Sequence, residues 1–454
     1  MELLNVYILT FNCARNLVEP EKFASHIFDG LKPSQPDASE AGTHLPEVLV
    51  LALQELAPIA YAFLGGSYLD PYYDAFRDAV RMAGAALVRD GNDYENACYQ
   101  NLLTRNAGMT ALMVFARSDI AERIRYIETA EVGVGVQEAG NKGAVGGRIG
   151  YLVGSEEDDS DAGDGIVEVT FVSAHLAPDE NGWERRNEDW KSIAQRLIFT
   201  SDEPEIPPAH AHEQEDEEGV PLLRASSSLS KPSTLYSPRS YLFVAGDLNY
   251  RTSDTGPGPK DYRKFPRPTE ETDNIARFAD LFAQDQLTRE REAGRTLNQL
   301  LETKIAFPPT YKYSLEARNL ASIDPNGDWK WAANRWPSWC DRILYLNHPS
   351  IAVEDEGIKI HEYTALPLFL TSDHRPVVLS ASIPLHALPE FGDLPSPVEI
   401  DPRWETRRTA ARRKELVVGA VAYLGLTWEG NALVLVTLLG VAFVYYALHA
   451  FPAS

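Results

Sequence analysis

The sequence predicts a layered fold of mixed α and β structure, and three observations support this. Short runs of apolar and β-branched residues recur along the chain, as expected of buried strands. Between several of them, apolar residues recur at helical spacing, so strands alternate with helices and hairpins. The chain has 454 residues, 44% of them hydrophobic, which is enough for a large core. Length alone would allow two or three domains, although large α/β enzymes often fill such a span as one unit.

The expected elements follow in chain order. The N-terminal residues MELLNVYILTFNCARN contain the first strand, at 5–11, and lack the basic start and long apolar run of a signal peptide. The other expected strands are 48–53, 110–116, 166–174, 241–245, 342–346 and 376–383. Helices are expected at 70–84 and 183–199, where apolar residues follow helical spacing.

Two acidic segments carry most of the formal charge of −24. Residues 154–165 hold six acids and residues 201–218 hold eight, and neither segment has a Lys or Arg; without these fourteen acids the rest would carry −10. Net charge reports on solubility and steering, so it does not exclude an anionic substrate. We expect 154–165 to be a long hairpin loop and 201–240 to be a disordered insert.

The three cysteines favour a reducing compartment. Cys13, Cys98 and Cys340 are an odd number and lack the spacing of a metal site. A secreted fold held by disulfides is therefore not expected.

The C-terminal segment changes character abruptly. Residues 386–415 form a Pro-rich and then basic linker, and residues 416–451 are almost wholly apolar. A membrane span needs about 20 apolar residues, which 432–451 supplies. We favour a single span at 432–451 preceded by an interfacial helix, because an intramembrane Glu429 is costly. A re-entrant hairpin with Glu429 near its tip stays open, and a buried core helix is the third alternative.

This apolar segment predicts a tail anchor with the preceding body in the cytosol. The basic residues 403–414 would stay on the cytosolic side and could contact anionic lipid heads. The endoplasmic reticulum is the favoured membrane, because the short apolar segment suits a thin bilayer, and the mitochondrial outer membrane is the alternative.

Polar side chains stand at the ends of several expected strands. Asp247 and Asn249 follow one strand two residues apart, so on an extended segment they would project to the same side and could orient and deprotonate water. A simple turn is the alternative. His374 follows Asp373 just before another strand, where it could hold a phosphoryl oxygen, move a proton, or make a structural hydrogen bond.

Other strand ends offer ligands for a metal ion and a phosphate. Glu55 ends a hydrophobic strand and suits Mg²⁺, and Asn12 is either a second oxygen donor or a cap. His175 ends a further strand, and Lys142 lies in a turn between glycines. Lys312 stands between two aromatic residues.

Taken in order, these clusters resemble the inositol polyphosphate 5-phosphatases of the endonuclease–exonuclease–phosphatase superfamily. The motifs are TFNCAR (10–15), LQEL (53–56), GNKGAV (140–145), SAHL (173–176), GDLNYR (246–251), PPTYKY (308–313), PSWCDRIL (337–344) and TSDHRPV (371–377). They cover residues 1 to about 385, and the C-terminal anchor is similar to that of tail-anchored, yeast-type members. The resemblance implies a four-layered α/β sandwich of two packed mixed β-sheets flanked by helices.

The resemblance also implies a role for each matching residue. Glu55 and Asn12 would bind Mg²⁺, Asp247 would activate the attacking water, and Asn249 would hold that water or a phosphate oxygen. His374, fixed by Asp341 and with Asp373 beside it, would contact the scissile phosphate together with His175. The residues that would read the 4-phosphate are Tyr250, Arg251 and Lys312, and those near the 1-phosphate are Asn141 and Lys142.

These roles imply hydrolysis of phosphatidylinositol 4,5-bisphosphate to phosphatidylinositol 4-phosphate by in-line attack of water, without a covalent intermediate. Many family members have a second His after SAHL, and this chain has none there, although Arg186 and Asn187 are kept. This puts phosphate affinity and substrate preference in doubt. The alternatives are a nuclease or sphingomyelinase of the same superfamily, or a non-catalytic membrane tether. A nuclease is disfavoured because no basic groove is expected, and so no nucleic-acid partner is expected.

Overall fold

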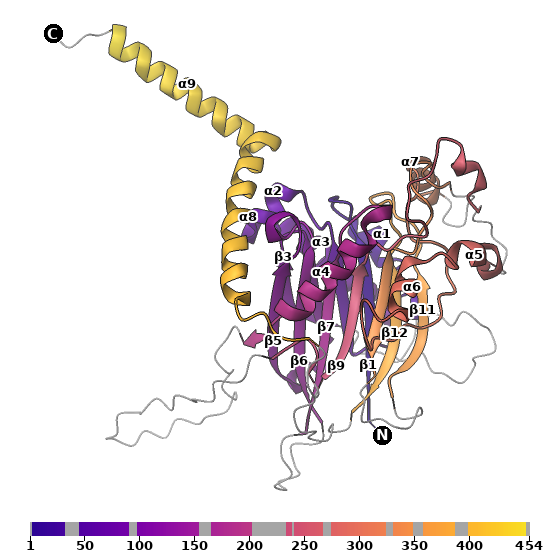
Figure 1. Cartoon of the computed structure of the whole chain (residues 1–454). Coiled ribbons are helices and arrows are strands. Elements are labelled where there is room, and N and C mark those ends of the chain that lie inside the picture. The colour runs from indigo at the N-terminus through magenta and orange to yellow at the C-terminus, as the bar shows by residue number, and fades with distance from the viewer. Residues whose placement is uncertain are drawn as a thin grey trace, which may run out of the picture.

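The fold is a sandwich of two β-sheets with helices on both outer faces (Figure 1). The computed structural model describes residues 2–31, 45–89, 98–153, 165–201, 233–237, 240–266, 274–323, 330–347, 357–385 and 398–450. Within these residues, each sheet has six strands. The predicted four-layered α/β sandwich is confirmed.

The first sheet has the strand order β11-β12-β1-β2-β4-β3. Its strands are β1 (Leu3–Asn12), β2 (Val48–Gln54), β3 (Tyr99–Ala107), β4 (Thr110–Arg117), β11 (Lys359–Ala365) and β12 (Val377–Pro384). β1 and β2 run parallel, and Asn12 lies opposite Gln54. The carboxyl ends of these two strands therefore meet at one edge of the sheet.

The second sheet has the order β10-β9-β7-β6-β5-β8. Its strands are β5 (Ile124–Gly133), β6 (Gly143–Leu152), β7 (Ile166–His175), β8 (Thr200–Ser201), β9 (Ser240–Asp247) and β10 (Asp341–Leu346). β7 and β9 are parallel, with His175 opposite Asp247. The antiparallel pair β6–β7 ends at Leu152 and Ile166, which agrees with the predicted hairpin, although residues 154–164 lie outside the described residues.

Three apolar layers hold the sandwich together. Side chains such as Val50 and Phe243 fill the space between the sheets. The outer face of the first sheet packs on α1 (Pro20–Ala24) and α3 (Asp70–Arg89). The outer face of the second packs on α4 (Trp183–Arg196) and α6 (Gln286–Glu292). The remaining described helices of the body are α2 (Ile59–Leu64), α5 (Asn274–Phe282) and α7 (Leu315–Ala321).

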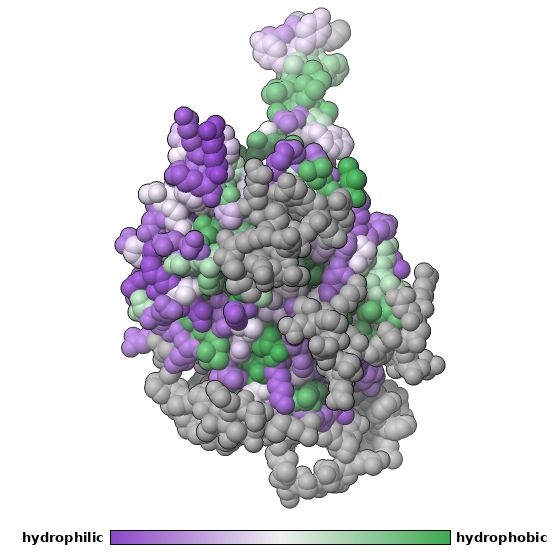
Figure 2. Space-filling view, turned by 90° about the vertical axis from the view of Figure 1, so that its right-hand side faces the viewer, coloured by the Kyte–Doolittle hydropathy of each residue, from purple (hydrophilic) through white to green (hydrophobic). Residues whose placement is uncertain are grey.

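The chain ends in two long helices. α8 (Trp404–Leu426) runs along the sandwich and packs against α2, and α9 (Trp428–Ala450) then leaves the body (Figure 1). The helical segment Trp428–His449 is long and apolar enough to cross a membrane, and no residue of its most apolar stretch is buried. Figure 2 shows a projection above the globular body that is green along its middle.

The C-terminal boundaries differ from those expected. The expected border between linker and anchor, at 415/416, lies inside α8, because the basic residues continue the helix and pair with acids of the body. α9 begins four residues before the expected span 432–451. The predicted insert 201–240 and the Pro-rich segment lie mostly outside the described residues.

Candidate active site

The ends of four strands bring the candidate site together. The Asn12 amide at the end of β1 donates a hydrogen bond to Asp247 Oδ2 at the end of β9, over 2.8 Å. Beneath it, Gln54 Nε2 donates to Ser173 Oγ, 3.2 Å away, and so joins β2 to β7. The two sheets are therefore linked by polar contacts at the edge where the parallel strands of each sheet end.

Asp247 is the centre of this cluster. Its Oδ1 accepts the Asn249 N–H at 3.1 Å, and its Oδ2 lies 3.3 Å from His175 Nε2 and 3.9 Å from His374 Nε2. Burial alone would raise the pKa of Asp247, but the charge of His374 and the hydrogen bond of His175 lower it well below its usual range. The carboxylate therefore stays ionised at neutral pH.

His374 is held from one side by a buried acid. Its Nδ1 lies 2.9 Å from Asp341 Oδ2, which also accepts from Thr310 Oγ1 at 2.6 Å. The imidazole ring packs on Tyr311, with 4.4 Å between centroids. Burial would lower the pKa of His374, but Asp341 and Asp247 raise it to about 9. His374 is therefore an imidazolium at neutral pH.

The surroundings of His175 lower its pKa, whereas those of His374 raise its pKa. Its Nε2 lies 2.5 Å from Lys142 Nζ, and burial and the Lys142 charge both lower the pKa of His175. Burial also lowers the pKa of Lys142, which lies 3.8 Å from Glu55 Oε1. The site thus combines one charged and one neutral imidazole on either side of Asp247.

The residues expected to bind a metal suit a hard divalent cation. Glu55 follows β2 in a left-handed conformation, with φ of 45°. Among the described residues, the cations that pair with its carboxylate are Arg15 (3.2 Å) and Lys142. Asn12, at the neighbouring strand end, offers a second oxygen. Oxygen donors of this kind fit Mg²⁺ or Ca²⁺.

A second group of possible ligands is Asp247, Asp341 and His374, whose ligand atoms lie within 4.8 Å of one another. In this group, Asp341 is already bonded to His374 and Thr310. The side-chain oxygen of Asn12 also accepts a hydrogen bond, from the Ala14 N–H at 2.9 Å, so the assignment of Glu55 and Asn12 to the metal stays a prediction.

The residues expected to bind the 4-phosphate are placed unequally. Arg251 is buried, donates to Asn249 Oδ1, and lies 4.5 Å above the Tyr311 ring. Tyr250 is fully buried, and its hydroxyl donates to Asn187 Oδ1 at 2.7 Å. Lys312 is half-buried and pairs with Asp373 Oδ2 at 2.8 Å. Of the three, Lys312 is the one with an accessible side chain.

Asn249 also differs from the expected geometry. β9 ends at Asp247, and Asn249 has φ of 59°, so the alternation of an extended strand does not continue. Its amide nitrogen donates to the Leu176 carbonyl at 3.1 Å, and its oxygen accepts from Arg251. Asn249 therefore braces Asp247 through its backbone N–H.

Asn141 and Lys142 line a pocket of about 710 Å³ beside this cluster. The pocket extends along residues 134–138 and reaches Arg185 and Asp189 on α4. Asn141 Oδ1 is buried without a hydrogen-bond partner among the described residues. An unpaired buried oxygen beside an ammonium group is a position that a polar ligand could satisfy.

Several supporting residues were not singled out from the sequence. Thr310 and Tyr311 fix Asp341 and His374, and Arg15 pairs with Glu55. Ser372 Oγ donates to the Asn12 carbonyl at 2.6 Å and accepts the His374 N–H at 3.0 Å. All four lie inside or directly beside the motifs named above, which is the one signal that could have found them.

Comparisons with known proteins show what this chain is similar to. The model of the endonuclease/exonuclease/phosphatase family 2 matches residues 9–380. Polyphosphatidylinositol phosphatase INP53 of Saccharomyces cerevisiae is 27% identical over 337 residues, which are 73% of this chain and 23% of that protein. Type II inositol polyphosphate 5-phosphatase 15 of Arabidopsis thaliana is 27% identical over 350 residues, covering 73% of this chain and 28% of that protein. The chain thus spans about a quarter of the length of these curated relatives.

A solved structure has the same fold. It is the inositol polyphosphate 5-phosphatase domain of a synaptojanin, in complex with inositol (1,4)-bisphosphate and a calcium ion. The TM-score is 0.54 and the identity is 20%, over 92% of this chain and 93% of that one.

Proposed function

Because this chain belongs to the endonuclease/exonuclease/phosphatase family 2, we propose that it is a metal-dependent phosphatase that removes the 5-phosphate of inositol lipids. The observation that carries the proposal is the convergence of Asn12, His175, Asp247 and His374, from four distant segments, into one buried cluster. Lys142 and Glu55 border the same cluster. Phosphate ester hydrolysis needs positive groups around the phosphoryl oxygens and a positioned water, and this cluster supplies both.

Asp247 is the residue that positions the water. Its two oxygens are fixed by Asn12 and by the Asn249 N–H, so the remaining lone pairs have a defined direction. Because its pKa is lowered, the Asp247 carboxylate is ionised and can accept a hydrogen bond from the water. It is a weak base toward the free water molecule. As the bond from water to phosphorus forms, the bond between phosphorus and the 5-oxygen of the ring breaks. The proton that the water gives up to Asp247 is balanced by one gained by the departing 5-oxygen, which leaves as a hydroxyl group.

Three positively charged groups would surround the phosphate. His374 as an imidazolium and Lys142 as an ammonium would each hold a phosphoryl oxygen. A divalent cation held by Glu55 and Asn12 would add charge neutralisation at the same oxygens. We take this cation to be Mg²⁺.

No protein nucleophile is needed in this scheme. Burial raises the pKa of the thiols of Cys13 and Cys340 well above the ordinary value, so both stay protonated. The proposed reaction is in-line attack by water, and neither of these thiols takes part as a nucleophile.

The proposed substrate is phosphatidylinositol 4,5-bisphosphate, and the product is phosphatidylinositol 4-phosphate. The names of the curated relatives support an inositol-phosphate substrate, and Lys312 offers a cation for the 4-phosphate. α9 supports a lipid substrate, because it would hold the body at a membrane as a tail anchor facing the cytosol. The endoplasmic reticulum is the proposed membrane, with the mitochondrial outer membrane as the alternative.

The test is phosphate release by the purified full chain in detergent micelles that contain this lipid, with and without Mg²⁺. Asp247→Asn should lower kcat by about 10²–10⁴-fold while lipid binding is kept. Asp74→Asn, at an exposed position on α3, is the matched control. A folded unmodified chain that binds the lipid without any turnover would instead support a tether.

A further inference from the structure

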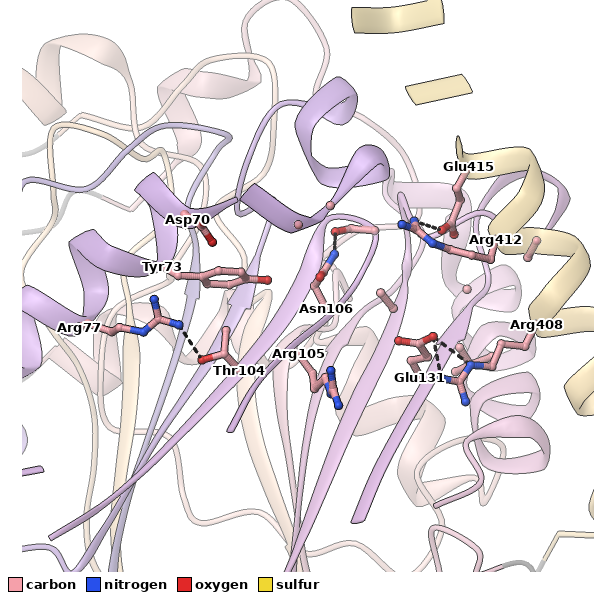
Figure 3. Close-up of a pocket in the computed structure, with 17 residues that line it drawn as sticks. Asp70, Tyr73, Arg77, Thr104, Arg105, Asn106, Glu131, Arg408, Arg412 and Glu415 are labelled. Carbon is pink, nitrogen blue, oxygen red and sulfur yellow. Dashed lines mark hydrogen bonds and ion pairs between the residues drawn. The ribbon is translucent and has the colours of Figure 1, made fainter. Parts of the chain in front are cut away.

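The middle of α8 makes polar contacts with the body, and Figure 3 shows Arg408 beside Glu131 and Arg412 beside Glu415. The buried carboxylate of Glu415 accepts the Gly140 N–H through Oε1 at 2.7 Å, and its Oε2 accepts from Arg412 at 3.1 Å. Arg412 also donates to the carbonyls of Phe63 and Leu64, at 2.8 and 3.2 Å. One helix thus contacts both the turn before Lys142 and the end of α2.

A chain of backbone hydrogen bonds continues from Glu415 into the site. The Gly140 carbonyl accepts from Met109 N–H at 2.9 Å, and the Met109 carbonyl accepts from Leu56 N–H at 3.1 Å. Leu56 directly follows Glu55, and Lys142 lies two residues after Gly140. Glu415 is therefore connected to both members of the pair Lys142–Glu55, whose charged groups are 3.8 Å apart.

The close approach of the backbone at Gly108 to the backbone at Gly140 depends on both residues being glycine. A Cβ added at Gly140 would lie 2.7 Å from Gly108 N, and one added at Gly108, whose φ is +54°, would lie 2.4 Å from Gly140 O. The two backbones can approach this closely only without side chains. The connection from Glu415 to Leu56 is therefore tightly packed.

Further contacts fix α8 along its length. Arg408 pairs with Glu131 on β5 at 2.7 Å, and Arg407 pairs with Glu138. Gly419 lies so close to α2 that an added Cβ would be 2.9 Å from Phe63 Cβ. α8 is therefore held against the body from Arg407 to Gly419.

We propose that α8 is part of the support of the active site, and that Glu415 is a positioning residue for Lys142 and Glu55. This inference rests on the proposed function and adds that α8, which leads to the proposed membrane span, does more than connect it to the body. Its consequence is that hydrolysis of a soluble substrate, which needs no membrane, depends on Glu415.

The experiment compares variants of the full chain in detergent micelles, with inositol 1,4,5-trisphosphate as substrate. Glu415→Ala removes the acceptor of a buried N–H and should raise KM about fivefold or more, with a smaller change in kcat. Glu415→Gln keeps an amide oxygen for Gly140 N–H and should restore most of the loss. Glu405→Ala, at an exposed position on the same helix, should change neither constant.

A purely structural contact would give another result. Glu415→Ala would then lower Tm but leave KM unchanged well below Tm, which would overturn the proposal. Arg412→Gln, which releases the end of α2, replaces Glu415→Ala if that variant does not fold, and it should also raise KM.

Amide hydrogen exchange gives a readout that does not depend on turnover. In Glu415→Ala, exchange should become faster at residues 140–142 and at Leu56; faster exchange confined to α8 would overturn the inference. An unmodified chain that hydrolyses no inositol phosphate would instead defeat the proposed function and leave the exchange result to decide this one.

Discussion

At the scale of single residues, the site contains two histidines that differ in charge: His374 is charged and His175 is neutral at pH 7. His374 gains its charge from Asp341 and Asp247, whereas His175 loses affinity for a proton through burial and the nearby Lys142. Both imidazoles contact the same carboxylate, that of Asp247. The difference arises from their neighbours and not from their exposure, since both are buried.

The charge of His374 can be measured directly. In the metal-free full chain, an NMR titration should place the pKa of His374 near 9 against an ordinary value of 6.5, and Asp341→Asn should move it down. Because the folded pKa is the higher one, the stabilisation is complete below pH about 6.5 and is lost as pH rises through about 9. A His374 that titrates near 6.5 in the unmodified chain would contradict this electrostatic account.

Lys312 should determine the preference for a 4-phosphate. Lys312→Ala removes a cation next to the site and should lower kcat/KM for phosphatidylinositol 4,5-bisphosphate by about 10–100-fold relative to a lipid with only a 5-phosphate. Lys330→Ala, an exposed lysine paired with Glu316, is the control. An equal loss on every substrate would favour another phosphodiesterase of the superfamily.

The residues also show where sequence reasoning stopped. The strand-end positions of Asn12, His175 and Asp247 were predictable, because parallel strands bring their carboxyl ends to one edge. The placement of Tyr250 was not predictable, because it depends on partners at Asn187 and Thr296 on distant segments. Its proposed contact with the 4-phosphate stays a prediction from the family resemblance, with its hydroxyl turned into the core here.

At the scale of elements, the fully buried strands were the predictable ones. β2, β4 and β9 contain continuous apolar runs and β12 is interrupted by two serines, and each was expected within two residues. β3, β5 and β11 alternate polar and apolar residues and have partly exposed faces, so they gave no continuous run. β6 reads GAVGGRIGYL, whose glycines resemble a turn.

The glycines of β6 have a packing role that can be tested. A Cβ at Gly147 would lie 2.5 Å from Leu103 Cδ2 and 3.1 Å from Leu112 Cδ2, in the core between the sheets. Gly147→Ala should therefore lower the free energy of unfolding by about 1–3 kcal/mol in urea titrations, with kcat retained under native conditions. Gly256→Ala, where an added Cβ meets nothing within 4 Å, is the control. Equal stability of the two variants would show that this part of the core relaxes freely.

At the scale of the whole molecule, α9 leaves the body at the end of the sandwich where α2 lies (Figure 1). α2 follows the Glu55 loop at that end, and Tyr61 on α2 donates to Glu429, in the first turn of α9, over 3.4 Å. Tyr423 on α8 packs edge-on against Tyr61 and Tyr68, and tyrosines of this kind are frequent at membrane–water interfaces. Sequence alone could not show this, because residues 404–415 resemble a linker until their acidic partners on the body are known.

Membrane attachment through α9 can be separated from catalysis. Leu438→Arg places a charge in the middle of α9, at an insertion cost of about 3 kcal/mol, and should move the protein from the membrane fraction to the soluble fraction. Turnover of soluble inositol 1,4,5-trisphosphate should be unchanged, since Leu438 is exposed and far along the chain from the docked part of α8. Leu438→Val is the control, and a variant that still sediments with membranes would contradict attachment by α9.

The docking of α8 has a kinetic consequence. A catalytic domain on a flexible linker would adopt many orientations above the membrane. A catalytic domain docked on the helix that leads to its own membrane span would stay at one height and tilt above one leaflet. Insertion of α9 would make its encounters with the lipid two-dimensional, so turnover on vesicles should follow the mole fraction of substrate in the bilayer and not its bulk concentration. Diluting the vesicles at fixed composition should leave the rate per enzyme unaltered.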